Sequence, residues 1–465
     1  MRSCVGSITL SVAEFSAGTS YENLPVTVVE RAKVHILDTL GVTIAGSVSE
    51  AADVSCRHLV DQGLGSWGSV IIGSRLRAPP RFAAFANAVS AHAYNFDDTT
   101  PQIRVDRTGG IHASGSVLPA VLAVGEETGA SGAEIISAYV TGVEISSRLN
   151  HAIAARHYED GFHPTGTLNG FGAACAAAQL RGLNTEEMIA AVSLSASQAS
   201  GVRRNFGTVA EIFHSGWAAE NGVLAADLAG RGVMGANDAL EGPTGFFYAA
   251  AGGSDKEEIL GRLGCPWVFE NPGIWIKPHP NGALTHPAAG CFLELVRKHN
   301  VLAKDVEQIT VHTNERVWKT LQHHNPETGM QARFSMEFIL AVLLLDRAAG
   351  LATFTDQTLA RREVWELMAK VAYTPYIRGE VNYTNVTTMI EITLVDGRRI
   401  ADRADHARGS RALPMEFEEV AEKFHLCATY GGCSDRTIDT LLAAVADLEH
   451  SRNTEKLVNS LILLR

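Results

Sequence analysis

GFGAACAAAQLRGLNTEEMIAAVSLSASQASG, residues 170–201, indicates how most of this chain folds. Its first half consists largely of Ala and Gly. Asn184, with Glu187 three residues later, has the spacing of a capping box at the start of a second helix. Because small side chains let helix axes approach closely, this stretch predicts two neighbouring helices in a tightly packed helical region.

The same texture extends on both sides of this stretch, from about residue 10 to residue 265. SGAEIISAYVTGVEISSRLN (131–150) begins with Ser131 and Glu134 in capping-box spacing, and apolar residues follow at helical intervals. HSGWAAENGVLAADLAGRGV (214–233) is similar. No heptad persists, so we expect a helical bundle and not a coiled coil. The N-terminal MRSCVGSITLSVAEFSAG is interpreted as a first amphipathic helix and not as a signal peptide.

The pattern changes near Cys265-Pro266. VEQITVHT (306–313) and VTTMIEITLVDGRRI (386–400) alternate apolar and polar residues, as strands do, and Asp396-Gly397 is a hairpin-type turn. FSMEFILAVLLLDRAAG (334–350) between them predicts a buried helix. The chain is then helical again. We therefore predict a mainly α protein with an inserted α+β domain: a helical domain from residues 1–270 and 406–465, and the α+β domain from residues 271–405.

Composition excludes several functions. The chain has 465 residues, 46% apolar and 19% charged, with a formal net charge of −12, so no basic face for nucleic acid is expected. No apolar run approaches the roughly 20 residues of a membrane span. Seven cysteines without a CxxC pair indicate reduced thiols, and we expect a cytoplasmic protein. No dinucleotide, Walker, HExxH or GxSxG motif is present.

Polar residues gather instead at four Gly- and Pro-rich breaks: residues 91–120, 160–174, 203–222 and 273–287. Singly, each reads most simply as a cap, a turn or a solvated charge. Together they bring His or Lys to several helix N-termini, which favour anions, and so they predict a pocket for a small carboxylate. The candidate catalytic residues are His112, His163 and Lys277. The candidate substrate-binding residues are Asn95, Asp98, Thr99, Arg104, Arg203, Glu211, His214 and His286. The histidines are too dispersed for a local metal signature, and no metal site is predicted.

These segments resemble the MmgE/PrpD family. The matching motifs are AHAYNFDDT, IHASGSVLPA, GFHPTGTLNGFGAA, NFGT with FHSGWAAENG, and KPHPNGALTH, in family order over nearly the whole chain. The resemblance implies a helical domain built from both chain ends, an inserted α+β lid domain and a homodimer. It also implies a cofactor-free active site between the domains, with His112, His163 and Lys277 at the family's histidine and lysine positions.

Two residues depart from the family pattern. Asn95 replaces the leading acidic residue of the first motif, and Glu211 replaces the lysine of the third, where Trp217 also replaces an arginine. Arg104 and Arg107, inserted before His112, are expected to restore positive charge. We expect an enzyme that abstracts an α-proton next to a carboxylate, first as an epimerase of an imino- or amino-dicarboxylate such as iminodisuccinate. The alternatives are a hydro-lyase acting on a 2-methylcitrate-like acid, a cis-aconitate-type decarboxylase, and a degenerate dimeric scaffold without activity.

Overall fold

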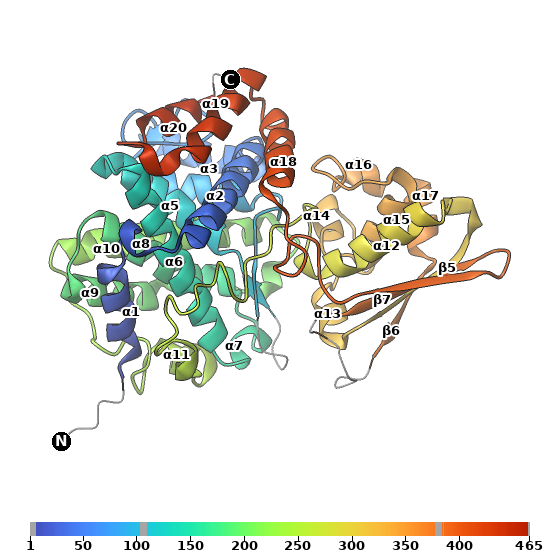
Figure 1. Cartoon of the computed structure of the whole chain (residues 1–465), viewed down its shortest axis with the longest axis horizontal. Coiled ribbons are helices and arrows are strands. Elements are labelled where there is room, and N and C mark those ends of the chain that lie inside the picture. Colours follow the sequence, from blue (N-terminus) through green and yellow to red (C-terminus); the bar gives the residue numbers. More distant parts are fainter. Residues whose placement is uncertain (1–5, 103–108, 377–383, 385, 464–465) are drawn as a thin grey trace.

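A helical body and a smaller region with a four-stranded sheet stand side by side in the computed structural model (Figure 1). The structure describes residues 6–102, 109–376, 384 and 386–463, so Arg104 and Arg107 lie outside the described residues. The prediction of a mainly α protein is confirmed. Among the described residues, no helix is both long and apolar enough to cross a membrane.

The body contains the helices of the first part of the chain and two short antiparallel ladders. These elements are α1 (Ile8–Gly18), α2 (Val26–Gly46), α3 (Glu50–Asp61), β1 (Ser69–Val70), β2 (Arg77–Ala78), α4 (Pro80–His92), β3 (Thr100–Pro101), β4 (Gly110–Ile111), α5 (Ala113–Thr128), α6 (Gly132–Ala152), α7 (Arg156–Glu159), α8 (Pro164–Leu180), α9 (Thr185–Gln198), α10 (Val209–Gly230) and α11 (Phe246–Ala251). Both predicted capping boxes are present, at the starts of α6 and α9.

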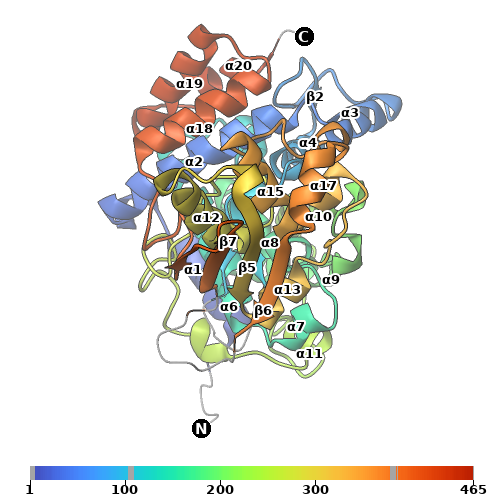
Figure 2. The ribbon, with the colours of Figure 1, turned by 90° about the vertical axis from the view of Figure 1, so that its right-hand side faces the viewer.

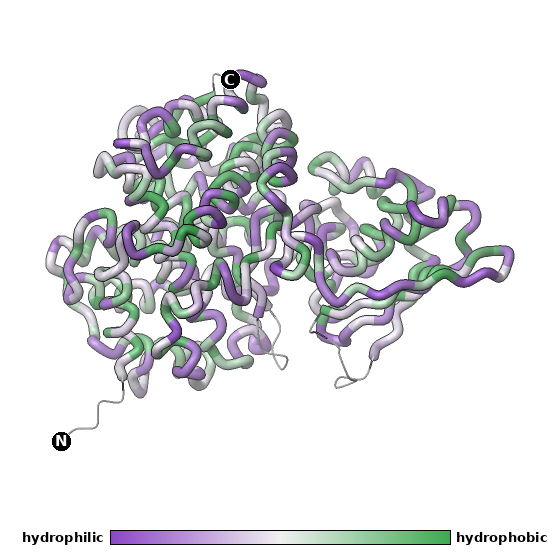
Figure 3. Tube along the Cα trace, viewed as in Figure 1, coloured by the Kyte–Doolittle hydropathy of each residue, from purple (hydrophilic) through white to green (hydrophobic). Residues whose placement is uncertain are grey.

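Glycine sets the distance between the central helices. A Cβ atom at Gly172 of α8 would lie 2.2 Å from the Gly142 oxygen of α6, and one at Gly222 of α10 would lie 2.5 Å from the Ala173 Cβ of α8. Real Cβ atoms do not approach so closely, so side chains at these positions would force the helices apart. Green and purple alternate along many helices of the body in Figure 3, because each turns one face to the core and one to solvent.

The smaller region folds around its own apolar cluster, which residues 288–394 supply. Its elements are α12 (His286–Lys298), β5 (Val306–Thr313), α13 (Glu315–Thr320), α14 (Gly329–Ala332), α15 (Met336–Asp346), α16 (Asp356–Leu359), α17 (Arg362–Met368), β6 (Val371–Pro375), β7 (Thr388–Leu394) and β8 (Arg399–Ala404). The strand order is β6-β5-β7-β8, with β5 and β6 parallel and the other pairs antiparallel. Strands β5, β6 and β7 face the viewer in Figure 2. The predicted strands and the buried helix are confirmed, and β6 is an addition.

The C-terminal helices return to the body. They are α18 (Phe417–Tyr430), α19 (Asp435–Ala446) and α20 (Glu455–Ser460), and α18 packs against α2, as Figure 1 shows in red and blue. Short 3-10 turns connect several elements: Tyr21–Asn23, Arg203–Asn205, Lys256–Glu258, Ala283–Thr285, Ala303–Asp305 and Leu448–His450. Both chain ends therefore contribute helices to one body.

Candidate active site

A cavity of about 950 Å³ opens where the body meets the smaller region. Its lining includes five of the predicted site residues: Asn95, Thr99, His112, His163 and Glu211. They come from three of the four polar breaks, which the fold thus brings together. The fourth break supplies Trp275 and residues 282–284 to the same lining.

Asn95 lies on the loop after α4, in the left-handed backbone region (φ 51°) that Asn tolerates better than most residues. Lys277 lies behind it and not in the cavity lining. The Lys277 Nζ donates to the Asn95 main-chain oxygen at 2.8 Å and also to its side-chain oxygen. Lys277 is 1% exposed, and burial lowers its pKa to about 8, although Asp97 opposes this shift. Its ammonium therefore loses its proton not far above neutrality.

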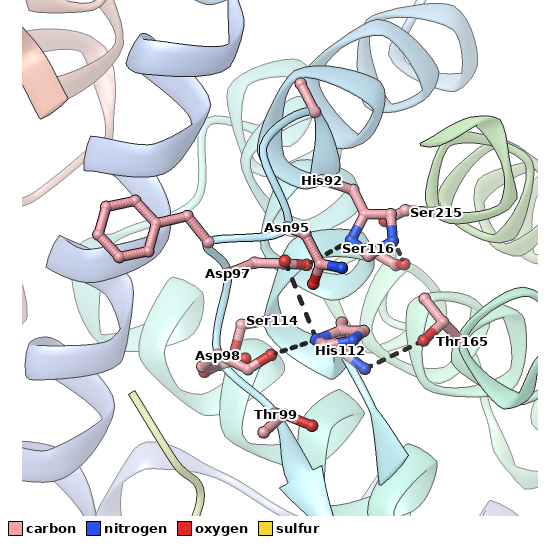
Figure 4. Close-up of polar contacts among 12 residues, drawn as sticks. His92, Asn95, Asp97, Asp98, Thr99, His112, Ser114, Ser116, Thr165 and Ser215 are labelled. Carbon is pink, nitrogen blue, oxygen red and sulfur yellow. Dashed lines mark hydrogen bonds and ion pairs between the residues drawn. The ribbon is translucent and has the colours of Figure 1, made fainter. Parts of the chain in front are cut away.

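Asp97 is fully buried, and three basic side chains surround its carboxylate. Its Oδ2 accepts from His92 Nδ1 at 2.8 Å, and its Oδ1 lies 3.9 Å from His112 Nδ1 (Figure 4). The same Oδ1 lies 3.9 Å from Lys277 Nζ. Burial opposes ionisation, but His92, His112 and Lys277 hold the pKa of Asp97 well below its usual range. The carboxylate is therefore the fixed anion at the centre of this set.

His92, the last residue of α4, is the cation that the sequence analysis did not identify. Burial alone would lower its pKa, but Asp97 and then Glu211 raise it to about 9. Its Nε2 lies 3.7 Å from the Glu211 Oε1. His92 is therefore an imidazolium near neutral pH, held between two carboxylates.

His112 is at the N-cap of α5, and its ring is fixed by the loop before it. Its Nδ1 donates to the Asp98 main-chain oxygen at 2.7 Å, and its backbone N–H donates to Thr165 Oγ1 at 3.2 Å (Figure 4). This leaves Nε2 as the ring nitrogen available to the cavity. Burial, and after it the charge of Lys277, lowers the pKa of His112 to about 3. The unliganded ring is therefore neutral.

His163 occupies the corresponding N-cap position of α8. Its Nδ1 lies 2.9 Å from the Nδ1 of His214, so one ring donates to the other. Burial and the adjacent His214 hold the pKa of His163 well below its usual range, and burial lowers the pKa of His214 to about 4. His214 does not line the cavity, and we assign it the orientation of His163.

Three further predicted residues lie outside the cavity lining. The Asp98 carboxylate accepts from His35 Nδ1 at 2.7 Å and from Ser114 Oγ at 2.6 Å. Arg203 lies over the Tyr158 ring, 3.7 Å from its centroid. His286 pairs with Asn281 at 2.7 Å. In the unliganded structure each of the three is engaged by other groups of the protein.

Among the described residues, no group of three or more His, Cys, Asp or Glu side chains could hold a metal ion. What the site offers is two neutral histidines, a buried lysine and a histidine–carboxylate pair beside one cavity. Such a set can bind an anion and move protons to or from its carbon atoms.

Comparison with known proteins identifies the family of this chain. Residues 11–259 match the MmgE/PrpD N-terminal domain, and residues 279–448 match the MmgE/PrpD C-terminal domain. The chain belongs to the MmgE/PrpD family, as its motifs predict.

Similar proteins over nearly the whole chain carry one activity in their names. Cis-aconitate decarboxylase of Homo sapiens is 29% identical over 460 residues, which cover 95% of this chain and 92% of that protein. The Mus musculus protein of the same name is 28% identical over 460 residues, or 95% and 91%. One from Aspergillus terreus is 26% identical over 486 residues, or 98% and 93%.

Proposed function

We propose that this protein is a cofactor-independent lyase that removes CO₂ from an unsaturated di- or tricarboxylate, as a decarboxylase of the cis-aconitate type. The observation that carries the proposal is the state of His112. Its Nδ1 proton is committed to the Asp98 carbonyl, and its Nε2 is available to the cavity. The names of the relatives support the same reaction.

The acid–base strengths of the unliganded site describe the state in which the reaction begins. The pKa of His112 is about 3 and that of His163 lies well below its usual value, so both rings are neutral before the substrate binds. Lys277, with a pKa of about 8, can instead supply positive charge.

A bound polycarboxylate changes the state of the histidines. Its negative charges raise the pKa of a nearby imidazole, so His112 gains a proton on Nε2 when the substrate enters. Lys277, held behind Asn95, adds a positive potential that helps to bind the carboxylates. The site thus acquires its acid only with substrate present.

Decarboxylation then needs one proton. The bond between a carboxylate carbon and its neighbour breaks, and its electron pair forms a new double bond to the next carbon. The electron pair of the original double bond takes the Nε2 proton of His112, and a C–H bond forms at the far carbon of that double bond. In balance, a trianion and one proton give CO₂ and a dianion, and His112 returns to neutral.

The α+β region, residues 271–405, acts in this proposal as a lid domain over the body, residues 1–270 and 406–465. Its support is that the cavity lining comes from both parts. His163 is the second catalytic candidate, beside the reacting carbons. Of the predicted binding residues, we keep Asn95, Thr99 and Glu211 as substrate contacts. The homodimer implied by the family remains a prediction.

The epimerase that the sequence analysis placed first has no counterpart among the relatives named above, and it is now second to decarboxylation. One experiment separates the reactions: incubate the protein with cis-aconitate-like acids in D₂O and follow ¹³C and ¹H signals. The proposal expects ¹³C-labelled CO₂ from an acid labelled at its carboxyl carbons, and a product in which one deuteron is bound to a carbon atom. Deuterium exchange at an α-carbon without CO₂ would favour the epimerase, and reversible addition or loss of water would favour the hydro-lyase.

A further inference from the structure

The cavity continues past the histidines into an apolar limb. Phe206 lies edge-on to His163, with ring centroids 4.8 Å apart, and Phe334 stacks on Phe206 at 5.5 Å and 12°. A Cβ atom at Gly282 would lie 3.5 Å from Phe334 Cδ1 and 3.3 Å from Leu321 Cδ2. All five residues line the cavity. They form a continuous path from the proposed catalytic centre.

The walls of this limb are suited to carbon and not to carboxylate. Ala283, Leu284 and Val317 also line the cavity beside the path. Val317 of α13 and Leu321, the residue that follows this helix, line it from the smaller region and belong to that region's apolar cluster. Thr320, a polar residue of the same helix, also lines the cavity. The Arg203 guanidinium lies 6.0 Å from the Phe206 ring centroid, but it donates to the Tyr158 main-chain oxygen at 2.6 Å. The apolar side chains named here give a carboxylate no charged partner in exchange for its hydration.

Charged side chains line the cavity as well. Arg262 and Arg411 are exposed members of the lining, with Glu258 also in it. Arg411 Nη1 donates to Asn271 Oδ1 at 2.8 Å, and both residues line the cavity. The cavity therefore offers arginine side chains for carboxylates in addition to the apolar limb.

We propose that the preferred substrate is a carboxylic acid with an apolar alkyl substituent that fills the limb of Phe206, Gly282, Leu284, Val317, Leu321 and Phe334. Its carboxylates face Arg262 and Arg411, and its reacting carbons lie at His112 and His163, an orientation that rests on the proposed function. The volume agrees, since about 950 Å³ is at the upper end of the roughly 300–1,000 Å³ typical of pockets for drug-sized ligands. A short polycarboxylate would leave the limb unfilled.

Binding without turnover tests the limb independently of the reaction. Calorimetric titration with saturated 2-alkylsuccinates, from methyl to octyl, measures the contribution of each methylene. Affinity should rise about fourfold per methylene until the limb is full, as expected when a CH₂ group leaves water. Affinity that is flat or falls with chain length would overturn the proposal.

Two variants with opposite effects locate the alkyl group of the bound ligand. Ala283→Leu should reduce the octyl-over-methyl affinity ratio about tenfold, because its added carbons occupy limb volume. Leu284→Ala should move the optimum to a longer chain. Ala443→Leu, an exposed position on α19 far along the sequence, adds the same bulk elsewhere and should leave the ratio unchanged. Equal ratios in Ala283→Leu and wild type would show that the alkyl chain binds outside the limb.

Turnover assays on the matching unsaturated acids separate the two proposals. Length-dependent binding without CO₂ release would contradict the decarboxylase and leave the limb standing. Turnover of short acids with no gain in affinity along the series would leave the decarboxylase standing and contradict the limb.

Discussion

The two walls of the cavity differ in what they hold. One wall is backed by buried ionisable groups linked to one another: His92 with Asp97 and His163 with His214 from the body, and Lys277, from the segment before α12, with Asn95. The wall from the smaller region presents Leu321 and Phe334 without a comparable network. Buried ionisable groups hold their geometry only when partners satisfy them, whereas apolar side chains can change size at lower cost. The ionisable groups on one wall therefore determine the reaction, and the apolar side chains on the other wall determine the shape of the substrate that fits.

The largest effect is expected among the buried ionisable groups, at Lys277. Lys277→Met should lower kcat about 1,000-fold, because it removes the cation behind Asn95 that attracts the carboxylates and the developing charge. Steady-state kinetics check this, with circular dichroism to confirm folding. Lys370→Met is a matched control, since that lysine binds the Val306 oxygen at 2.6 Å in the smaller region. A Lys277→Met enzyme within tenfold of wild type would remove Lys277 from the mechanism.

The two histidine pairs should differ in how they depend on pH. His92 has a raised pKa, so its ion pair with Asp97 stabilises the fold fully below pH 6.5, and this contribution is lost as pH rises through about 9. His92→Gln should therefore lower the free energy of unfolding by about 3 kcal/mol below pH 6.5 and by much less above pH 9. Urea unfolding at both pH values measures the difference.

His163 provides the opposite sign as a control. Its pKa is lowered, so the folded state resists protonation, and stability falls as pH drops below about 6.5. His163→Gln should lessen that acid loss. A cost of His92→Gln that does not change with pH would contradict an ionised His92–Asp97 pair.

A smaller effect is expected from the charge that distinguishes this chain at Glu211. Glu211→Gln removes a carboxylate from the cavity wall and should lower KM for a tricarboxylate about tenfold, or 1.4 kcal/mol. A monocarboxylate of similar size should change less. An unchanged KM for the tricarboxylate at low ionic strength would show that Glu211 faces His92 alone and not the substrate.

The smallest change is expected at Asn95. Wild-type kcat/KM should fall above about pH 8 as Lys277 loses its proton. Asn95→Asp adds an anion beside the ammonium, which raises the pKa of Lys277. The fall in kcat/KM should therefore move by about one pH unit to higher pH. A pH–rate profile of both proteins measures the shift. A fall in kcat/KM at the same pH in both proteins would mean that another group controls it.

The sequence predicted elements better than contacts. Strand 306–313 and the capping boxes at Ser131 and Asn184 follow from local patterns, and the structure confirms them. Strand β6 was not predicted, because its residues are partly exposed and end in Pro375, so no alternation marks them. Its pairing with β5 is parallel and depends on chain brought back from far away.

The candidate site shows the same limit. Asp97 and Asp98 are adjacent in sequence, yet Asp97 contacts His92 and Asp98 contacts His35, because the loop turns between them. His92 was overlooked although it lies five residues before Asp97. A histidine at the end of a helix shortly before an acidic pair is a signal that could have been used. Whether Lys277 lines the cavity or lies beneath it depends on tertiary packing, which spacing does not encode.

Proton uptake on binding tests the central claim most directly. Propane-1,2,3-tricarboxylate is saturated and cannot be decarboxylated by the allylic route, so titration calorimetry near neutral pH, in two buffers of different ionisation enthalpy, counts the protons that accompany binding. The account predicts an uptake close to one proton per site in wild type, lost in His112→Gln. Binding with no proton uptake, or with uptake unchanged in His112→Gln, would contradict a substrate-charged His112 as the acid.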